Sequence, residues 1–153
     1  MSRWAPRSAS RQLALQVLYA VDLARGARPG SSMPPVPVAD EVFEEVARHF
    51  DRPEGARVFA RELVAGVMAD RNALDERIGR CARNWRVERM AAVDRNVLRL
   101  AAYELSATDT PASVVIDQAI ELARRFGDDP SPAFVNGVLD AVARDGIGEG
   151  VGT

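Results

Sequence analysis

An aromatic ring, a carboxamide and a glycine occur together in the stretch Phe134-Val135-Asn136-Gly137. An aromatic ring at a helix start can stack on an unpaired base, and an amide can hydrogen-bond to the edge of a base. On a helical wheel, Asn136 and Gly137 both fall outside the apolar arc of this segment, which is centred near Val142. Phe134 lies at the edge of that arc, so a place in the core is its alternative. A glycine inside a helix costs roughly 1 kcal/mol relative to alanine, which indicates that a ligand or a neighbouring helix approaches Gly137 closely.

Two arginines one helical turn apart form a second candidate site. Arg95 and Arg99 lie about 40° apart on a helical wheel, opposite the apolar arc of their own segment. Such a pair makes a positive ridge suited to phosphates, and a solvated helix face is the alternative. Asp94 and Glu104 lie inside or beside the apolar arc, where a carboxylate needs a partner. That partner is either an arginine of the chain or a docked protein.

The remaining composition excludes several kinds of site. The chain has one histidine, His49, and one cysteine, Cys81, so a metal site with several histidine ligands is excluded. Ser-His or Cys-His catalysis could use only His49, which lies in a polar segment expected to be an exposed helix. We therefore predict no catalytic residue and no metal ligand. A single cysteine forms no intrachain disulfide, which fits a reducing cytosol and predicts a cytoplasmic protein. No apolar run is long enough to span a membrane.

Arginines are unevenly distributed along an acidic chain. The sequence has 153 residues and a formal net charge of −2, so any site for nucleic acid must be a local basic patch. Residues 1–28 carry five arginines and one acid, and residues 71–99 carry eight arginines and four acids. Residues 36–56 carry six acids and two arginines. If the two arginine-rich segments are neighbours in the fold, they form one basic face.

Helical periodicity runs through nearly the whole chain and predicts an all-α protein of about seven helices. Hydrophobic residues make up 47% of the sequence, enough for the packed core of a single domain, expected over residues 1–145. Residues 26–37 are expected to form a flexible linker and residues 146–153 a disordered tail. The helices are expected at about residues 8–24, 39–50, 53–69, 70–83, 90–105, 111–127 and 131–145.

Short signals mark the ends of the last two helices. Thr110 and Ser131 are expected N-caps, each followed by a proline in the first turn, and Gly127 is expected to end the helix between them. The pair Asn136-Gly137, which often forms a tight turn, then lies inside the last helix.

The first helix is apolar on two sides. One arc is ordinary core, and Leu15, Tyr19 and Leu23 form a second stripe on the other side. Such a helix is either sandwiched between two helical halves or presents one face to a partner. The first arc contains Leu13, Ala14, Val17, Leu18, Val21 and Ala24.

Three segments resemble the NusB family of transcription antitermination factors. They are "RQLALQVLYAVD" near the start, "VDRNVLRLAAYEL" in the middle and "VVIDQAIELARRFGDDPSPAFVNGVLD" near the end. Their order and spacing also match, and the resemblance covers roughly residues 8–143. It implies two small helical bundles packed around a shared N-terminal helix, with no enzymatic activity and no cofactor.

The same resemblance implies a function and its partners. Proteins of this family bind the single-stranded boxA element of rRNA leader RNA together with a small-subunit ribosomal protein, called NusE in that role. The pair joins the transcription elongation complex, supports processive transcription past terminators and assists rRNA maturation.

Candidate site residues follow from the matching positions. The residues expected to face RNA are Arg3, Arg7, Arg11, Arg95, Arg99, Phe134 and Asn136. The residues expected to face the ribosomal protein are Tyr19, Glu88 and Asp94. The chain departs from the family in a thinner N-terminal arginine cluster. It also has Pro130 where the family carries an acid, a role for which Asp128 and Asp129 are candidates.

Other functions share parts of this pattern. The fold also occurs as the RNA-binding domain of rRNA cytosine methyltransferases, but this sequence has no glycine-rich cofactor loop and no catalytic cysteine motif, so at most a stand-alone relative is expected. A helical protein-interaction adaptor with weak or no RNA binding is the alternative from another class, favoured by the thin arginine cluster and the net acidity. Pairing of two copies through the RNA-facing surfaces also stays open.

Overall fold

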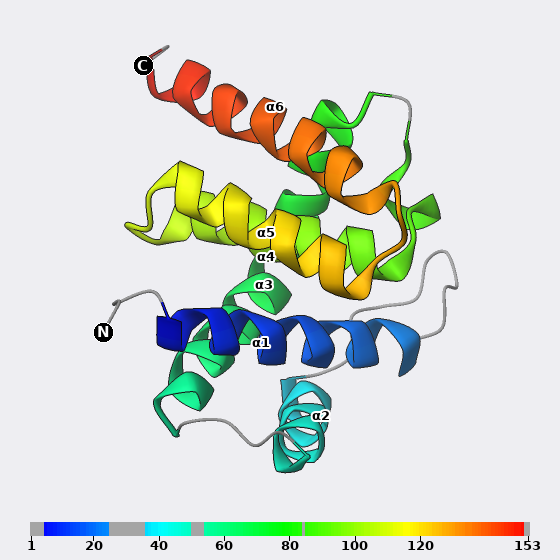
Figure 1. The fold of residues 1–153 in the computed structure, drawn as a ribbon, viewed down its shortest axis with the longest axis vertical. Helices are drawn as coiled ribbons and strands as arrows, with labels where there is room; N and C mark the ends of the chain where they lie inside the picture. Colours follow the sequence, from blue (N-terminus) through cyan, green and yellow to red (C-terminus); the bar gives the residue numbers. More distant parts are fainter. Residues whose placement is uncertain (1–4, 25–35, 50–53, 84, 152–153) are drawn as a thin grey trace. The chain divides into compact units, whose positions relative to one another are not determined.

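The computed structural model describes residues 5–24, 36–49, 54–83 and 85–151. In this part of the chain every regular element is a helix, which confirms the all-α prediction (Figure 1). The six α-helices and one 3₁₀ helix are, in chain order, α1 (Ala5–Ala24), α2 (Val36–Arg48), α3 (Glu54–Cys81), η1 (Val87–Arg89), α4 (Ala92–Ala107), α5 (Ala112–Phe126) and α6 (Ser131–Val151). None of these helices is long and apolar enough to cross a membrane.

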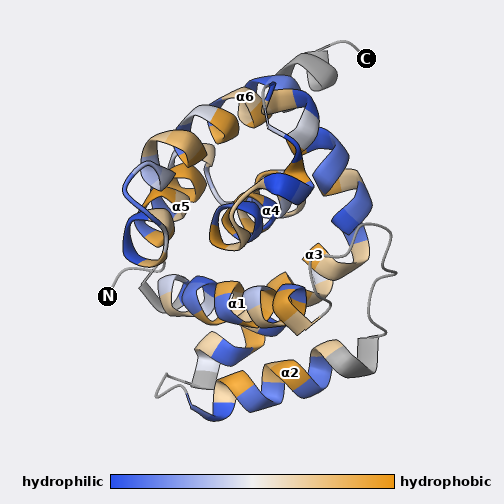
Figure 2. Ribbon diagram, turned by 90° about the vertical axis from the view of Figure 1, so that its right-hand side faces the viewer, coloured by the Kyte–Doolittle hydropathy of each residue, from blue (hydrophilic) through white to orange (hydrophobic). Residues whose placement is uncertain are grey.

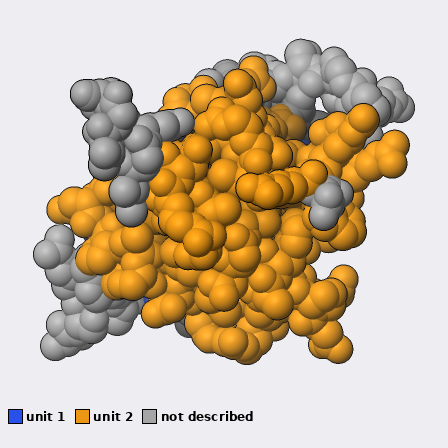
Figure 3. Space-filling view, turned by 90° about the horizontal axis from the view of Figure 1, so that it is seen from above, with its two compact units in different colours: residues 1–66 blue, residues 67–153 orange. Residues whose placement is uncertain are grey.

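The chain divides into two compact units, and the view in Figure 3 shows mainly the surface of unit 2. Unit 1 covers Met1–Gly66 and unit 2 covers Val67–Thr153, so the boundary falls within α3. The break predicted near Asp70 is wrong, because α3 continues through it. Apolar side chains keep their helical spacing across this position and are buried on both sides of it, at Leu63, Val67, Leu74 and Ile78.

Unit 1 is built by α1, α2 and the first part of α3. Helix α1 packs against α2, and the Ser10 hydroxyl of α1 donates a 2.7 Å hydrogen bond to the carbonyl of Ala56 in α3. Along α2, hydrophobic and hydrophilic residues alternate with the helical period (Figure 2). The buried apolar side chains of this unit include Leu13, Leu15, Val17, Leu18, Phe43 and Leu63.

The second apolar stripe of α1 has two different surroundings. Leu15 is buried, whereas Tyr19 is 37% and Leu23 57% exposed. The sequence left burial of the whole stripe and presentation to a partner as alternatives. The structure buries one end of the stripe and leaves the other end accessible.

Unit 2 is organised around α4, which packs against both α5 and α6. Every residue of α4 from Arg95 to Ala102 is buried, so this helix is covered on all sides. Its partners contribute one apolar face each. These faces include Val115, Ala119 and Leu122 of α5, and Val135, Leu139 and Val142 of α6.

The turn between α5 and α6 follows the prediction closely. Gly127 caps the C-terminus of α5, and its N–H donates a 2.9 Å hydrogen bond to the carbonyl of Ala123. A Cβ atom at Gly127 would lie 2.6 Å from Ser131 Oγ and 2.8 Å from the carbonyl oxygen of Ala123, so only glycine fits without a shift. Ser131 Oγ in turn accepts a 3.1 Å hydrogen bond from the Asp128 N–H.

Four boundaries differ from the prediction. Helix α6 begins at Ser131 itself, so Ser131 is its first residue rather than its N-cap. Pro111 rather than Thr110 occupies the N-cap position of α5, and no side chain caps this helix. Helix α2 begins at Val36, inside the expected linker 26–37, and the rest of that linker lies outside the described residues. Helix α6 runs to Val151, through the segment expected to be a tail from residue 146, because glycine lowers helix propensity without preventing helical hydrogen bonding.

Candidate RNA interface

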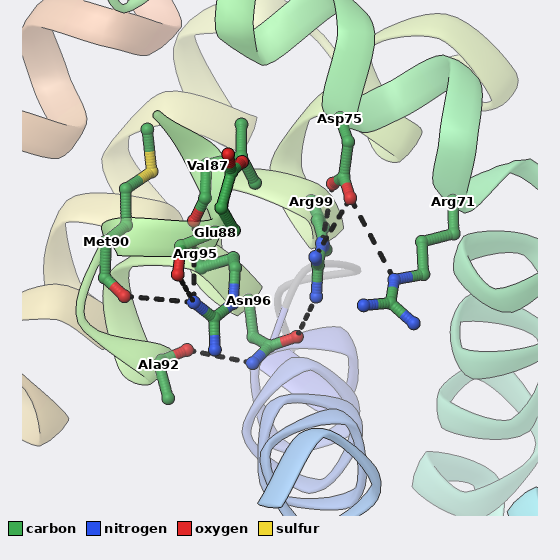
Figure 4. A network of polar contacts seen from close by, with 9 residues as sticks. All are labelled: Arg71, Asp75, Val87, Glu88, Met90, Ala92, Arg95, Asn96 and Arg99. Carbon is green, nitrogen blue, oxygen red and sulfur yellow. Dashed lines mark hydrogen bonds and ion pairs between the residues drawn. The ribbon is translucent and has the colours of Figure 1, made fainter. Parts of the chain in front are cut away.

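Arg99 forms a buried bidentate ion pair within unit 2 (Figure 4). Its Nε lies 2.7 Å from Asp75 Oδ1 and its Nη2 lies 2.9 Å from Asp75 Oδ2. The remaining terminal nitrogen, Nη1, donates a 3.3 Å hydrogen bond to Asn96 Oδ1. Arg99 is 4% exposed, so its guanidinium joins α4 to α3.

Arg95 is also committed to the interior of unit 2. Its Nη1 donates hydrogen bonds to the carbonyl oxygens of Met90 at 3.0 Å, and of Val87 and Glu88 at 3.4 Å each. These carbonyls belong to the short segment that contains η1 and precedes α4 (Figure 4). Arg95 is 7% exposed, so it holds this segment in place from the inside.

The predicted positive ridge on α4 is therefore wrong as a surface feature. A helical wheel places Arg95 and Arg99 opposite the apolar arc, a side expected to face phosphate or solvent. The wheel describes one helix and not its neighbours. In the fold, α3 and the segment before α4 cover this side, and both arginines use their donors on groups of the chain.

The N-terminal arginines share one aromatic ring in unit 1. The guanidinium carbon of Arg7 lies 4.5 Å from the centroid of Phe59, and that of Arg11 lies 5.9 Å from it. Both are cation–π distances. Arg7 is half-buried, whereas Arg11 is 2% exposed, so only Arg7 of this pair has surface that a ligand could reach in this conformation. Arg3 lies outside the described residues.

The Phe134 region of α6 is accessible. Phe134 is half-buried and Asn136 is exposed, which confirms that Asn136 lies off the core face. A Cβ atom at Gly137 would meet no described atom within 4 Å, so among the described residues no neighbouring helix explains this glycine. Phe134 makes an edge-to-face contact with Trp85, with ring centroids 5.8 Å apart and an interplanar angle of 72°.

The residues expected to face a protein partner are at least partly accessible. Tyr19 in unit 1 is 37% exposed, and Glu88 in unit 2 is exposed. Asp94, in the first turn of α4, is half-buried. Its Oδ1 atom is buried and accepts no hydrogen bond from the described residues. The position of this carboxylate in the sequence pattern predicts a partner for it, and the described part of the chain supplies no hydrogen-bond donor for Oδ1.

The acidic segment has an internal role in unit 1. Arg61 of α3 pairs with Glu44 and Asp40 of α2, and Arg57 Nη2 lies 2.9 Å from Glu44 Oε2. The hydrogen bond from Arg61 lowers the pKa of Glu44 below its ordinary value, because it stabilises the carboxylate. The acids of α2 are thus partly neutralised by the chain itself. Among the described residues no group of histidine, cysteine or acidic side chains could hold a metal ion.

Trp85 is a surface residue for which the sequence pattern predicted no role. It lies between the expected helices 70–83 and 90–105, yet it is 56% exposed and contacts Phe134. The signal was present in the stretch "RNWRVER", where an aromatic residue is interleaved with arginines. Periodicity alone could not show that this stretch meets α6.

The chain is similar to proteins of one family. The NusB family pattern matches residues 8–144. The transcription antitermination protein NusB of Sorangium cellulosum is 47% identical over 140 residues, which are 91% of this chain and 92% of that protein. The protein of the same name from Solibacter usitatus is 44% identical over 141 residues, 92% of this chain and 90% of that protein.

Solved structures agree with these sequence relatives. The structure of T. maritima NusB superposes with a TM-score of 0.76 at 33% identity and covers 92% of each chain. A crystal structure of the antitermination factors NusB and NusE in complex with dsRNA contains a chain that superposes with a TM-score of 0.77 at 27% identity. That alignment covers 95% of this chain and 99% of the other.

Proposed function

This chain belongs to the NusB family, and we propose on that basis that it is a transcription antitermination factor that binds boxA leader RNA together with the ribosomal protein NusE. The observation that carries the proposal is the match of the family pattern across residues 8–144, supported by curated relatives of nearly the same length. The protein acts in the cytoplasm, within the elongation complex on rRNA operons. Its mechanism is assembly, with no bond made or broken.

The RNA side of the proposal is supported by the accessible surface of unit 2. Phe134 offers a partly exposed ring, and Asn136 offers donors and an acceptor to a base edge. The open space beside Gly137 allows a ligand to approach the backbone of α6. Arg95 and Arg99 contribute indirectly, because they hold the elements on which the accessible residues stand.

The protein side of the proposal is supported by a structural relative and by one unsatisfied carboxylate oxygen. A chain of similar fold has been crystallised with NusE and dsRNA. In the present chain, Asp94 Oδ1 is buried and lacks a donor among the described residues. A donor from a docked protein removes the penalty of leaving this oxygen unsatisfied. Glu88 is exposed in η1, just before α4, and adds negative charge to the same unit.

A mobility-shift titration tests the proposal. The full chain is mixed with NusE and titrated against boxA RNA and against a scrambled RNA of the same length and composition. We expect tighter binding to boxA and an affinity that falls as the salt concentration rises. Equal binding to both RNAs, with and without NusE, would contradict the proposal and favour a protein-interaction adaptor.

The variants for this titration must be chosen from accessible residues. Substituting Arg11 or Arg99 removes a buried side chain, so a loss of binding would not separate an RNA contact from a loss of folding. Asn136→Ala changes an exposed amide and leaves the core face of α6 intact. We expect it to weaken boxA binding at unchanged stability, and Asp140→Ala, also exposed on α6, serves as the control.

A further inference from the structure

Three arginines around Trp85 differ from the other arginines of the described chain. Arg83, Arg86 and Arg89 are exposed, and none of them has an ion pair, hydrogen bond or ring contact with a side chain that the structure describes. Arg125 lies over Phe126, and Arg95 is bonded to carbonyls. The arginines paired with a carboxylate are Arg48, Arg57, Arg61, Arg71, Arg77, Arg80, Arg99, Arg124 and Arg144.

Trp85 lies between Arg83 and Arg86 in the sequence. It is 56% exposed, and its ring meets Phe134 edge to face, so more than half of the residue remains accessible. The segment that carries it is not loose. Val87 and Met90 are buried at 7% and 5% exposure, and Arg95 is bonded to the carbonyls of both. Trp85, Arg86 and Arg89 are therefore exposed on a segment whose buried residues and carbonyls hold it in place, and Arg83 is exposed just after the end of α3.

We propose that Trp85, together with Arg83, Arg86 and Arg89, is a nucleotide-binding element in which an unpaired RNA base stacks on the indole beside Phe134 and the arginines hold the flanking phosphates. The inference rests on the proposed RNA-binding function and adds to it a binding element from the segment between α3 and α4. Stacking on an exposed aromatic ring is favourable for every base, and free guanidinium groups supply the phosphate contacts that stacking alone lacks.

Charge favours RNA over a protein as the occupant. The exposed charged residues of the described positions between 83 and 89 are three arginines and one acid, Glu88. Several exposed arginines elsewhere in the described chain are offset by an acid one turn away, as in the pairs of Arg48 with Glu45 and Arg124 with Glu121. A protein ligand would have to bring its own acids to this surface, whereas every nucleotide carries a phosphate.

The stacking claim can be tested by fluorescence, because the chain has only two tryptophans, Trp4 and Trp85. In a Trp4→Phe protein, Trp85 is the only indole, and we expect its emission to be quenched saturably when boxA RNA is added to the complex with NusE. Trp85→Ala should weaken RNA binding about 5- to 150-fold, the range expected for one stacked base. Trp85→Phe, which keeps a ring, should retain most of the affinity.

The phosphate claim is tested by salt dependence. Replacing Arg83, Arg86 and Arg89 by glutamine should reduce the slope of log affinity against log salt concentration by about 2, since each phosphate contact to single-stranded RNA contributes about 0.7. Replacing Arg48, Arg124 and Arg144 by glutamine changes the net charge equally, and these side chains are 68%, 60% and 73% exposed. This control should leave the slope nearly unchanged.

Each outcome has a distinct meaning. One result would show that the inference is wrong while the proposed function stands. In that case wild-type protein prefers boxA, but Trp85 emission does not change when RNA is added. The Trp85 variants and the triple variant of Arg83, Arg86 and Arg89 also bind RNA as wild type does. Equal effects of the two triple substitutions would show a general charge effect and would also overturn it. So would a Trp85→Ala protein that loses NusE binding in the absence of RNA but keeps its RNA affinity, because Trp85 would then contact protein. Wild-type protein without any boxA preference overturns both proposals.

Discussion

At the scale of single residues, the two arginines of α4 illustrate how burial changes the meaning of a charge. Arg99 is 4% exposed, and its charge is tolerated in the interior because the carboxylate of Asp75 accepts hydrogen bonds from its Nε and Nη2. Asp75 itself is less enclosed, with a side chain 26% exposed. The two partners therefore depend on the pair to different degrees. Removing the carboxylate leaves a buried cation, whereas removing the arginine leaves an anion that water can reach.

This asymmetry gives a prediction for stability. Asp75→Asn should lower the free energy of unfolding by about 3 kcal/mol, because it leaves the Arg99 guanidinium without its counter-charge. Arg99→Met should cost less, since Arg71 Nε remains 3.9 Å from Asp75 Oδ2. Urea unfolding of both variants and of the double variant measures the difference. A larger loss for Arg99→Met than for Asp75→Asn would contradict the assignment of the pair.

At the scale of elements, the short segment containing η1 matters most for the proposed binding surface, because it carries exposed Trp85 and Glu88. Short 3₁₀ segments have few backbone hydrogen bonds of their own. Here the Arg89 N–H donates to the Arg86 carbonyl at 3.0 Å, and the Met90 N–H donates to the Val87 carbonyl at 3.2 Å. The buried side chain of Arg95 adds a hydrogen bond to the carbonyl of Met90 and so holds the segment from the interior. We interpret Arg95 as a positioning residue for this segment.

Arg95→Gln tests this interpretation. Loss of a charge-assisted hydrogen bond is worth about 1.5–3 kcal/mol, so the amides of Arg89 and Met90 should exchange with solvent at least about tenfold faster. RNA affinity should fall in the same variant, although Arg95 is buried. Hydrogen exchange and RNA titration on the same sample are the measurements, with Arg124→Gln as control. A fall in RNA affinity with unchanged exchange would indicate a direct contact instead.

Two glycines of unit 2 give a matched pair of predictions at the same scale. Gly127→Ala should destabilise the protein by about 1–3 kcal/mol, because the new Cβ would lie 2.8 Å from the backbone oxygen of Ala123. Gly137→Ala should stabilise it by up to about 1 kcal/mol, because the added methyl group meets no described atom and alanine favours helix. Thermal or urea unfolding measures both, and equal effects of the same sign would contradict the structure at this turn.

At the scale of the whole molecule, the sequence predicted the helical class and most of unit 2 because these features are local. Amphipathic periodicity located α4, α5 and α6, and Gly127 marked the end of α5. The motif around Asn136 was correctly placed inside a helix. These signals depend only on residues a few positions apart.

The rest depended on contacts between distant segments, which periodicity does not encode. The burial of Arg95 and Arg99 arises from elements that cover the polar side of α4. The contact of Trp85 with Phe134 joins the segment before α4 to α6. The continuity of α3 was missed because Asp70 is a good cap in isolation, but buried side chains on both sides of it favour one helix.

If the chain binds RNA and a ribosomal protein as one assembly, each ligand must raise the affinity for the other. The dissociation constant for boxA RNA is determined with and without saturating NusE, at one salt concentration. We predict tighter binding with NusE, and linkage requires that RNA tighten NusE binding by the same factor. Identical dissociation constants in the two titrations, or no measurable boxA binding in either, would contradict the account.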